Sequence, residues 1–246
     1  MLRYERRDDG NGELRERIVA MAHRHRRHGY LMIHLRLRQA GWMMNLKRVR
    51  RLYRQENLMV QKRKRKKVAL CDRQPLVRPS LANEVWSMDF VFDRLADGRS
   101  LKCLTVVDDA THESVAITPD MAISGAYVAR VLERVKHQRG LPKVIRSDNG
   151  KEFCGRAMAI WAHENNVALR FIEPGKPNQN AYVESFNGRL RDKCLNEHWF
   201  TSLTHARMAI EEWRRDYNEE RPKKDLGGVP PVVYAKESST VCSDGL

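Results

Sequence analysis

The chain has 246 residues, of which 41% are hydrophobic and 31% are charged, and its formal net charge is +15. This length and apolar content are enough for one sizeable core and a small second domain. No apolar run reaches the roughly 18 residues that a membrane span needs, so we expect a cytoplasmic protein without a membrane partner. The five cysteines are far apart and odd in number, which predicts reduced thiols and no disulfide framework.

Positive charge is concentrated in the first third of the chain. Residues 1–80 hold 23 Lys and Arg against 7 Asp and Glu, whereas residues 81–246 hold 23 against 24 and are close to neutral. A basic module of this kind neutralises phosphates and releases counterions. The alternative, a solvated charged surface, is disfavoured because the excess charge belongs to one segment. The distribution therefore predicts a nucleic-acid partner.

Three helices are predicted ahead of residue 59. Apolar positions recur at helical spacing over residues 13–27 and 30–40, and Gly41 can adopt the left-handed conformation that ends the second helix. Asn45 is a suitable N-cap for the third helix. We expect residues 1–59 to form a helix-turn-helix-like DNA-binding module, with an ordinary helical hairpin as the alternative. The third helix carries five basic side chains expected to contact DNA: Lys47, Arg48, Arg50, Arg51 and Arg54.

Six consecutive positive charges follow this module. Such a block repels itself and cannot enter a core, and Pro75 and Pro79 disfavour regular structure after it. We expect residues 60–82 to be a basic linker that contacts DNA, the alternative being a tether without specific contacts. The six residues are Lys62, Arg63, Lys64, Arg65, Lys66 and Lys67.

The remaining chain predicts an α/β core. Strand-forming runs at residues 84–94, 101–108 and 114–118 predict three antiparallel strands. A helix, a short strand, a second helix and a last strand follow, at residues 124–140, 144–145, 156–166 and 168–172. Strands first, then strand and helix in alternation, are typical of the ribonuclease H-like fold. We expect this core, with a C-terminal helical extension, to span residues 83–236, and residues 237–246 to form a tail.

A further helix is predicted after the break at residues 174–177, with Asn178 as its cap. Val183, Phe186, Leu190 and Cys194 recur on one face of this helix, and Glu184 and Arg191 fall on a neighbouring face. Glu184 can therefore point from a packed helix into a cleft. Arg191, two turns further on, is placed to contact a phosphate of the DNA.

Three carboxylates stand on three separate elements and can meet only through folding. Asp89 lies in a strand, Asp148 ends another strand, and Glu184 lies on the helix, 35 residues separating Asp148 from Glu184. Magnesium prefers oxygen ligands of this kind, and two ions about 4 Å apart can neutralise the oxygens around phosphorus and activate an attacking oxygen. The alternative for each residue is a solvated acid, and for Asp148, followed by Asn149 and Gly150, a simple turn.

The surroundings of these carboxylates carry a family resemblance. Trp86-Ser-Met-Asp89-Phe90, Arg146-Ser-Asp148-Asn-Gly150 and the Pro-Asn-Gln-Asn segment ahead of Glu184 are similar to the DDE transposases and retroviral integrases. The chain most closely resembles the OrfB-type transposases of the bacterial IS-three family. The resemblance implies that Asp89, Asp148 and Glu184 are catalytic metal ligands for two Mg²⁺ ions, for which Mn²⁺ can substitute, and that Asn180 contacts DNA. It favours Asp89 over four other carboxylates, namely Asp93, Asp108, Asp109 and Glu152.

The resemblance also implies a function. A transposase of this family cuts a phosphodiester at the ends of its element and uses the freed 3′-OH to attack a second strand. The implied partners are double-stranded DNA at the terminal repeats and target, further copies of the chain on that DNA, and an upstream OrfA-type DNA-binding protein, separate or fused. The expected place is the bacterial cytoplasm, at the nucleoid when bound to DNA. Two alternatives stay open: a catalytically impaired protein that only binds element ends, and a structure-specific nuclease of the same fold.

The match departs from the family pattern at four positions. Lys223 follows Arg221-Pro222 where members usually have His, and Val229 precedes Pro230 where they have Thr. Lys193 and Leu31 replace an acidic and a basic residue. These departures leave all three carboxylates in place.

Overall fold

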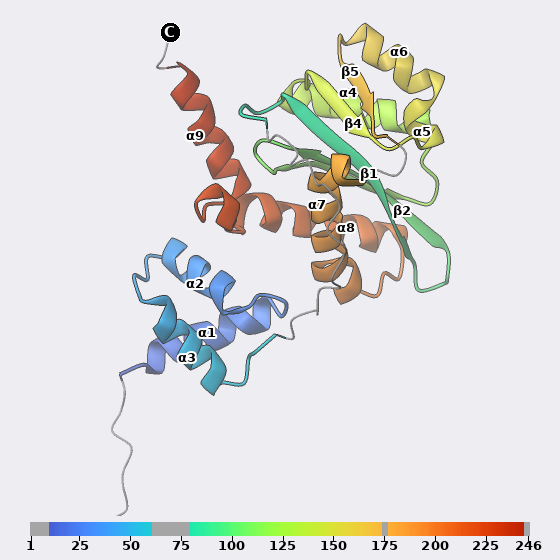
Figure 1. The fold of residues 1–246 in the computed structure, drawn as a ribbon. Coiled ribbons are helices and arrows are strands. Elements are labelled where there is room, and N and C mark those ends of the chain that lie inside the picture. Colours follow the sequence, from blue (N-terminus) through green and yellow to red (C-terminus); the bar gives the residue numbers. More distant parts are fainter. Residues whose placement is uncertain (1–9, 61–78, 174–176, 244–246) are drawn as a thin grey trace, which may run out of the picture. The chain divides into compact units, whose positions relative to one another are not determined.

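The computed structural model describes residues 10–60, 79–173 and 177–243 (Figure 1). The chain divides into two compact units, Met1–Ala69 and Leu70–Leu246. The division falls inside the expected basic linker, and the six consecutive charges at residues 62–67 lie outside the described residues.

The first unit is built from α1 (Gly12–Arg24), α2 (Tyr30–Gln39) and α3 (Leu46–Gln55). The Asn45 side chain accepts a hydrogen bond from the backbone N–H of Lys47 at 2.8 Å, which confirms it as the cap of α3. Gly41 has a φ of +84°, as the left-handed end of α2 requires. The predicted extent of α1 to residue 27 is wrong, since residues 25–27 form a turn. These residues offer no aliphatic side chain to the core, which is made of Leu14, Ile18, Ala22, Ile33, Leu37, Val49, Leu52 and Tyr53.

The second unit is organised around one five-stranded sheet, with strand order β3-β2-β1-β4-β5. Its first three strands are antiparallel, and β4 and β5 run parallel to β1. Strand β3 continues two residues beyond the prediction and includes Pro119, which an edge strand tolerates because one side has no hydrogen-bonded neighbour. The strands are β1 (Val85–Arg94), β2 (Ser100–Asp108), β3 (Ser114–Asp120), β4 (Val144–Ser147) and β5 (Ala168–Phe171).

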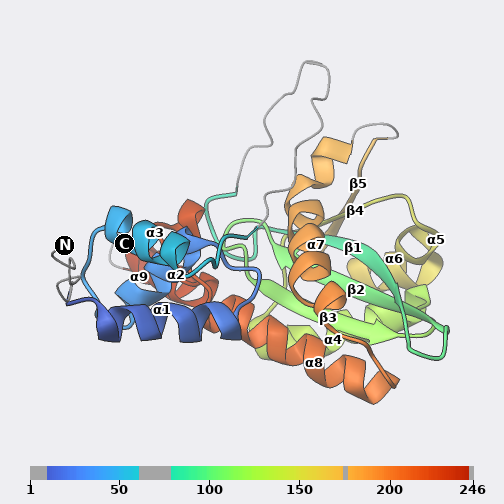
Figure 2. The same ribbon diagram turned by 90° about the horizontal axis from the view of Figure 1, so that it is seen from below.

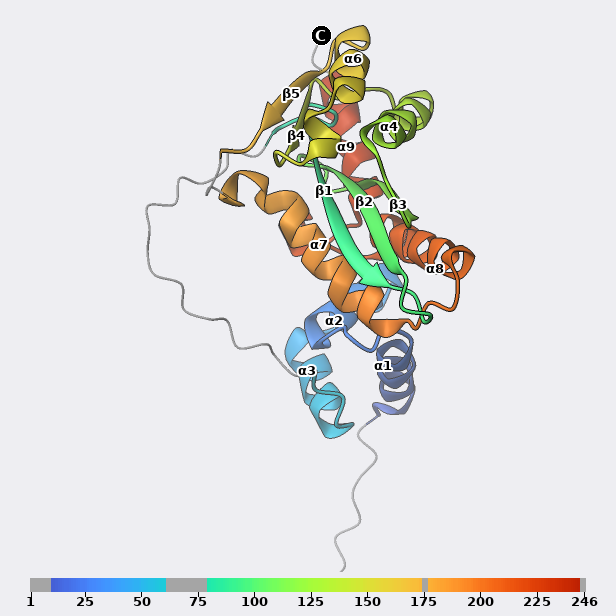
Figure 3. The same cartoon turned by 90° about the vertical axis from the view of Figure 1, so that its right-hand side faces the viewer.

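Helices cover both faces of this sheet (Figures 1 and 3). Trp86 and Met88 of β1 join the core under α4 (Gly125–Arg139) and α6 (Arg156–Glu164). Because side chains alternate along a strand, the residues between them face the other way. Val91 accordingly belongs to the core under α7 (Ala181–Lys193) and α8 (Leu203–Arg215). Asp89 lies two residues before Val91 on the same strand, so its side chain is on the same face of the sheet, the one covered by α7.

The remaining elements revise two expectations. A 3₁₀ turn, η1 (Pro177–Asn180), precedes α7, so the cap position belongs to Asn180 and the predicted cap at Asn178 is wrong. Helix α9 (Pro231–Ser243) continues through most of the expected tail, since no Gly or Pro interrupts residues 232–243. Along the described parts of the chain, no helix is long and apolar enough to cross a membrane. The other short elements are α5 (Lys151–Cys154), η2 (Leu195–Glu197), η3 (Asp216–Glu220) and η4 (Lys224–Leu226).

Candidate active site

Two of the predicted carboxylates come from neighbouring parallel strands. Strand β1 pairs with β4 so that Ser87 lies opposite Arg146. When this register is continued by two residues, Asp89 comes to lie opposite Asp148, which directly follows the last residue of β4. Parallel neighbours lie about 4.8 Å apart. The sheet itself therefore brings Asp89 and Asp148 together.

The third carboxylate is carried by α7, which packs on β1 and β2. Val183 and Phe186 are buried beneath the helix and fix its rotation, so that Glu184 lies on its exposed side. One turn later, the Nδ2 of Asn187 donates a hydrogen bond to Oδ2 of Asp89 at 2.8 Å. Glu184 and Asn187 are three residues apart and share a helical face. Helix α7 runs beside β1 in Figure 2, and the Asn187 bond directs the side of α7 that carries Glu184 toward Asp89.

Asn187 is the site residue that the sequence reasoning did not single out. Its Oδ1 lies 2.9 Å from the Thr105 hydroxyl, which lies 3.0 Å from the Asp89 carbonyl oxygen and can donate to either. The amide is thereby oriented with its NH₂ group toward the carboxylate. The three-residue spacing from Glu184 was a usable signal, but the contact with Asp89 depends on how α7 packs against β1.

The electrostatics of Asp89 reflect this crowding. Burial raises the pKa of Asp89 to about 6, helped by the negative charges of Asp148 and Glu184. The backbone N–H of Phe90, donating at 2.7 Å, and the Asn187 amide act in the opposite direction. Loss of solvation also raises the pKa of Glu184. Such a set of acids disfavours its own full ionisation and gains when a cation neutralises it.

The donor chemistry fits a hard divalent cation, since all three side chains offer carboxylate oxygens. Within the described parts of the chain, however, no three His, Cys, Asp or Glu side chains gather closely enough to hold one ion. The three carboxylates are therefore near enough to influence one another, but their side chains are not arranged to coordinate a single ion.

Three of the four competing carboxylates have structural partners. Asp108 is buried, pairs with Arg139 at 3.2 Å and accepts bonds from the backbone N–H groups of residues 110 and 111. Asp109 is fully buried and pairs with Arg146 at 3.0 Å. Glu152 forms an ion pair with Lys102. Asp93 lies four residues beyond Asp89 and accepts from the N–H of Arg94. The negative charges of both Asp148 and Glu184 act on Asp89.

Two residues predicted to contact DNA, Asn180 and Arg191, donate hydrogen bonds to the backbone of β1. Asn180 is 3% exposed, and its Nδ2 donates to the carbonyl of Met88 at 3.2 Å. This bond anchors the start of α7 to β1, and the contact of Asn180 with DNA stays a prediction. Arg191 remains exposed, and its Nη2 donates to the carbonyl of Phe92 at 3.1 Å.

The predicted basic face of α3 is exposed along its whole length. Arg48 donates through Nε to Oδ1 of Asn11 at 2.7 Å, and the Arg50 guanidinium lies 5.5 Å from the ring centre of Tyr30. Lys47, Arg51 and Arg54 make no side-chain hydrogen bond or ion pair with any other described residue. These three side chains are the ones available to a partner.

Comparison with known proteins agrees with this architecture. Residues 79–177 and 165–231 match models of the integrase core domain, and residues 10–67 match an HTH-like domain. The HTH-like match favours the predicted helix-turn-helix-like module over a plain helical hairpin.

Among solved structures, the HTLV-2 integrase catalytic core has a TM-score of 0.52 at 16% identity, and the match covers 63% of this chain and 97% of that chain. A chain of the simian T-cell lymphotropic virus intasome has a TM-score of 0.59 at 15% identity, covering 88% and 73%. The expected ribonuclease H-like integrase fold is confirmed.

An integrase core joined to a helix-turn-helix-like unit defines a DNA-recombining protein of the transposase and integrase class. The uncharacterized 31.7 kDa protein of insertion element IS407 from Burkholderia multivorans is 50% identical over 236 residues, which cover 96% of this chain and 85% of that protein. The 39.2 kDa protein of insertion element IS476 from Xanthomonas euvesicatoria is 50% identical over 227 residues, covering 92% and 66%. The chain belongs to the IS-three family of insertion-sequence transposases.

The departure at Lys223 has a structural explanation. Lys223 is buried, and its Nζ bonds to the carbonyl of His112 at 3.1 Å and to the Tyr217 hydroxyl. The lysine thus ties the segment after α8 to the turn between β2 and β3. This position lies in the packing of the C-terminal extension.

Proposed function

We propose that the chain is a metal-dependent DNA strand-transfer enzyme that cuts at insertion-sequence ends and joins the freed 3′-OH to a second strand. In this proposal, Asp89, Asp148 and Glu184 form the catalytic metal site. The observation that carries the proposal is the register of β1 and β4, which, continued by two residues, sets Asp89 opposite Asp148. The Asn187 bond to Asp89 adds the side of α7 that carries Glu184.

The three carboxylates are proposed to hold two Mg²⁺ ions, with Mn²⁺ able to substitute. When bound, the metal neutralises charge on the phosphate oxygens and lowers the pKa of the attacking hydroxyl. The similar HTLV-2 core was solved in complex with magnesium. The protein contributes fixed positions for its ligands. Asp89 is oriented by the Phe90 N–H and by Asn187, and α7 is anchored to β1 by Asn180.

Positive charge on other parts of the chain is proposed to hold the DNA. Lys47, Arg51 and Arg54 on α3 are exposed and available to phosphates. The consecutive charges at residues 62–67 are proposed to add contacts without sequence choice. Arg191, on the exposed side of α7, is proposed to contact DNA close to Glu184.

Assembly is part of the proposal. The similar simian viral chain was solved in an intasome, and we infer that several copies of this chain act together on DNA. An OrfA-type DNA-binding protein is proposed as a further partner, separate or fused. The IS476 protein is longer than this chain, which spans 66% of it.

The test uses labelled duplex DNA ending in the inverted repeats that flank the gene, incubated with a second duplex, with and without Mg²⁺. We expect a joined product only when metal is present, and none from Asp148→Asn. Cutting without joining would favour a structure-specific nuclease. Binding without cutting would favour an impaired protein that occupies element ends. Joining that survives either metal removal or Asp148→Asn would refute the proposed site.

A further inference from the structure

Two arginines lie beside the acidic site on the same face of the sheet. The strand pairing places Ser87 of β1, Arg146 of β4 and Arg170 of β5 in one row. Two residues further along the strands, the same register places Asp89, Asp148 and Ile172 in the next row. Residues two apart on a strand share a face. Arg146 and Arg170 therefore stand next to each other, one row behind the carboxylates.

These arginines line a hollow of about 360 Å³ at the edge of the sheet. It adjoins the loop of Asp148, because the Nδ2 of Asn149 donates to the Ile172 carbonyl at 3.0 Å. On its other side, Gln179 of η1 accepts from the N–H of Glu173 at 2.8 Å and donates to its carboxylate at 3.0 Å. The lining residues are Arg146, Arg170, Phe171, Ile172, Glu173 and Gln179.

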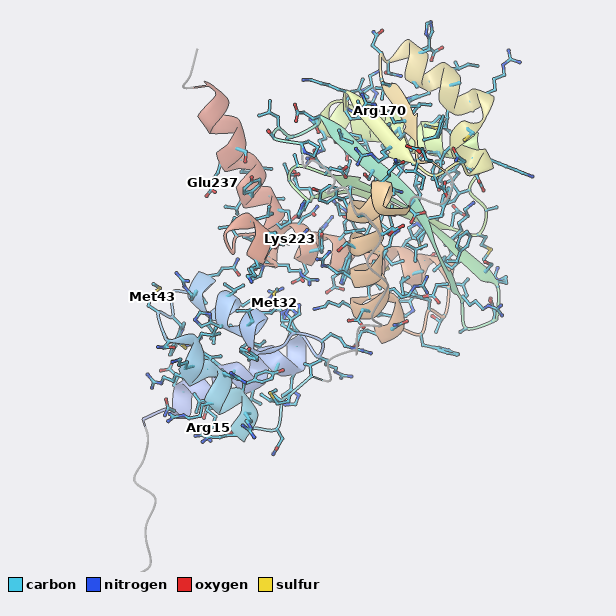
Figure 4. The ribbon with its side chains drawn as sticks, viewed as in Figure 1. Arg15, Met32, Met43, Arg170, Lys223 and Glu237 are labelled. Carbon is cyan, nitrogen blue, oxygen red and sulfur yellow. The ribbon has the colours of Figure 1, made fainter. Side chains whose placement is uncertain are left out.

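The charged side chains around the hollow differ in whether they already have a partner within the protein. Arg146 pairs with the buried Asp109, and the Glu173 carboxylate accepts from Gln179. Arg170 is exposed and forms neither a hydrogen bond nor an ion pair within the described ranges. Figure 4 shows Arg170 at the β5 end of the sheet. Its guanidinium thus keeps its donors available for an outside acceptor.

We propose that this hollow binds a phosphate of the DNA strand that enters the acidic site, with Arg170 as its main donor and Arg146 beside it. The proposal rests on the strand-transfer function above. One row of the sheet is about 7 Å, or on the order of two nucleotide rises of about 3.4 Å along a DNA strand. A strand whose reacting phosphate lies at the carboxylates therefore has another phosphate within reach of the arginines. Guanidinium groups suit this task because they bind phosphate oxygens in pairs.

Arg170 is the residue to change. Replacing Arg146 would leave the buried carboxylate of Asp109 without its partner and risk unfolding. The matched control is Arg134→Ala, which removes another exposed positive charge, from α4 on the opposite face of the sheet. Melting temperatures of both variants are expected to match the parent, since neither side chain holds the fold.

The first measurement is DNA affinity against salt, made in a full-length Glu184→Gln background so that the labelled duplex is not consumed. Arg170→Ala should weaken binding severalfold and reduce the slope of log affinity against log salt by about 0.9, the value of one phosphate contact. Arg134→Ala should leave the slope unchanged. Equal slopes for the two variants would overturn the proposal.

The second measurement is strand joining in the otherwise unaltered chain. Arg170→Ala should raise the KM for the duplex severalfold while kcat stays within about twofold, and Arg170→Lys should recover part of the loss. A fall in kcat with unchanged KM would contradict a binding role. If the unaltered chain joined no strands, the proposed function would fail, while the salt slopes would still decide the phosphate site.

Discussion

Asp89 owes its position to donors from two different elements. The Phe90 N–H is local, while the Asn187 amide arrives from α7, 98 residues along the chain. Burial, helped by the neighbouring acids, raises the pKa of Asp89 to about 6. The two donors favour the charged carboxylate, which is the form that binds metal. Asn187 is therefore a positioning residue for the proposed site.

Removing the Asn187 amide should weaken Mg²⁺ binding at the site while changing the melting temperature little. We expect Asn187→Ala to raise the Mg²⁺ concentration for half-maximal strand joining by about 10- to 100-fold, as is typical for partners of metal ligands. Asn196→Ala, an exposed asparagine in η2, serves as the control. A metal requirement equal to that of the control, or activity lost in step with melting temperature, would assign Asn187 a structural role only.

At the scale of elements, local patterns predicted most of the fold. Alternation and helical spacing are local properties, and they located the three antiparallel strands and the α7 face with Val183 and Phe186 buried. The strand register is not local, because β1 and β4 pair through residues 59 positions apart. For this reason, neither the placement of Asp148 opposite Asp89 nor the Asn187 contact could be derived from the sequence.

The wrong predictions occur where elements end. Asn178 was expected to cap α7, but η1 intervenes and Asn180 turns its side chain to the Met88 carbonyl. The four-residue helix α5 was not predicted at all, because it is too short to show a periodic pattern. Helix α9 continues past residue 236 because nothing in the sequence ends it there. Tertiary contacts and short turns decide such boundaries.

The C-terminal extension offers a test of packing at this scale. Lys223→Ala removes the bonds to the His112 carbonyl and the Tyr217 hydroxyl and leaves buried acceptors behind. We expect the free energy of unfolding to fall by about 1–3 kcal/mol. The adjacent Lys224 is exposed, and its change to Ala should stay within about 0.5 kcal/mol. Denaturant unfolding that gives equal values for both variants would contradict the packing role.

At the scale of the whole molecule, we expect DNA affinity and strand-transfer chemistry to be divided between segments. Residues 1–80 carry a strong positive excess and residues 81–246 are close to neutral. Removing residues 1–80 should weaken DNA binding and flatten its salt dependence, because the groups that release counterions go with them. Titration of a labelled duplex at several salt concentrations measures this. An unchanged slope would show that the basic segment does not bind DNA.

The central claim is that Asp89, Asp148 and Glu184 act as one metal site. Residues that work as a unit are non-additive, so removing a second member costs little once the first is gone. The most direct measurement is the strand-joining rate of Asp148→Asn, Glu184→Gln and the double variant, with melting temperatures alongside. We predict that each single change lowers the rate by orders of magnitude at unchanged melting temperature and that the double variant is no slower. An active Glu184→Gln protein, or losses that multiply in the double variant, would contradict the account.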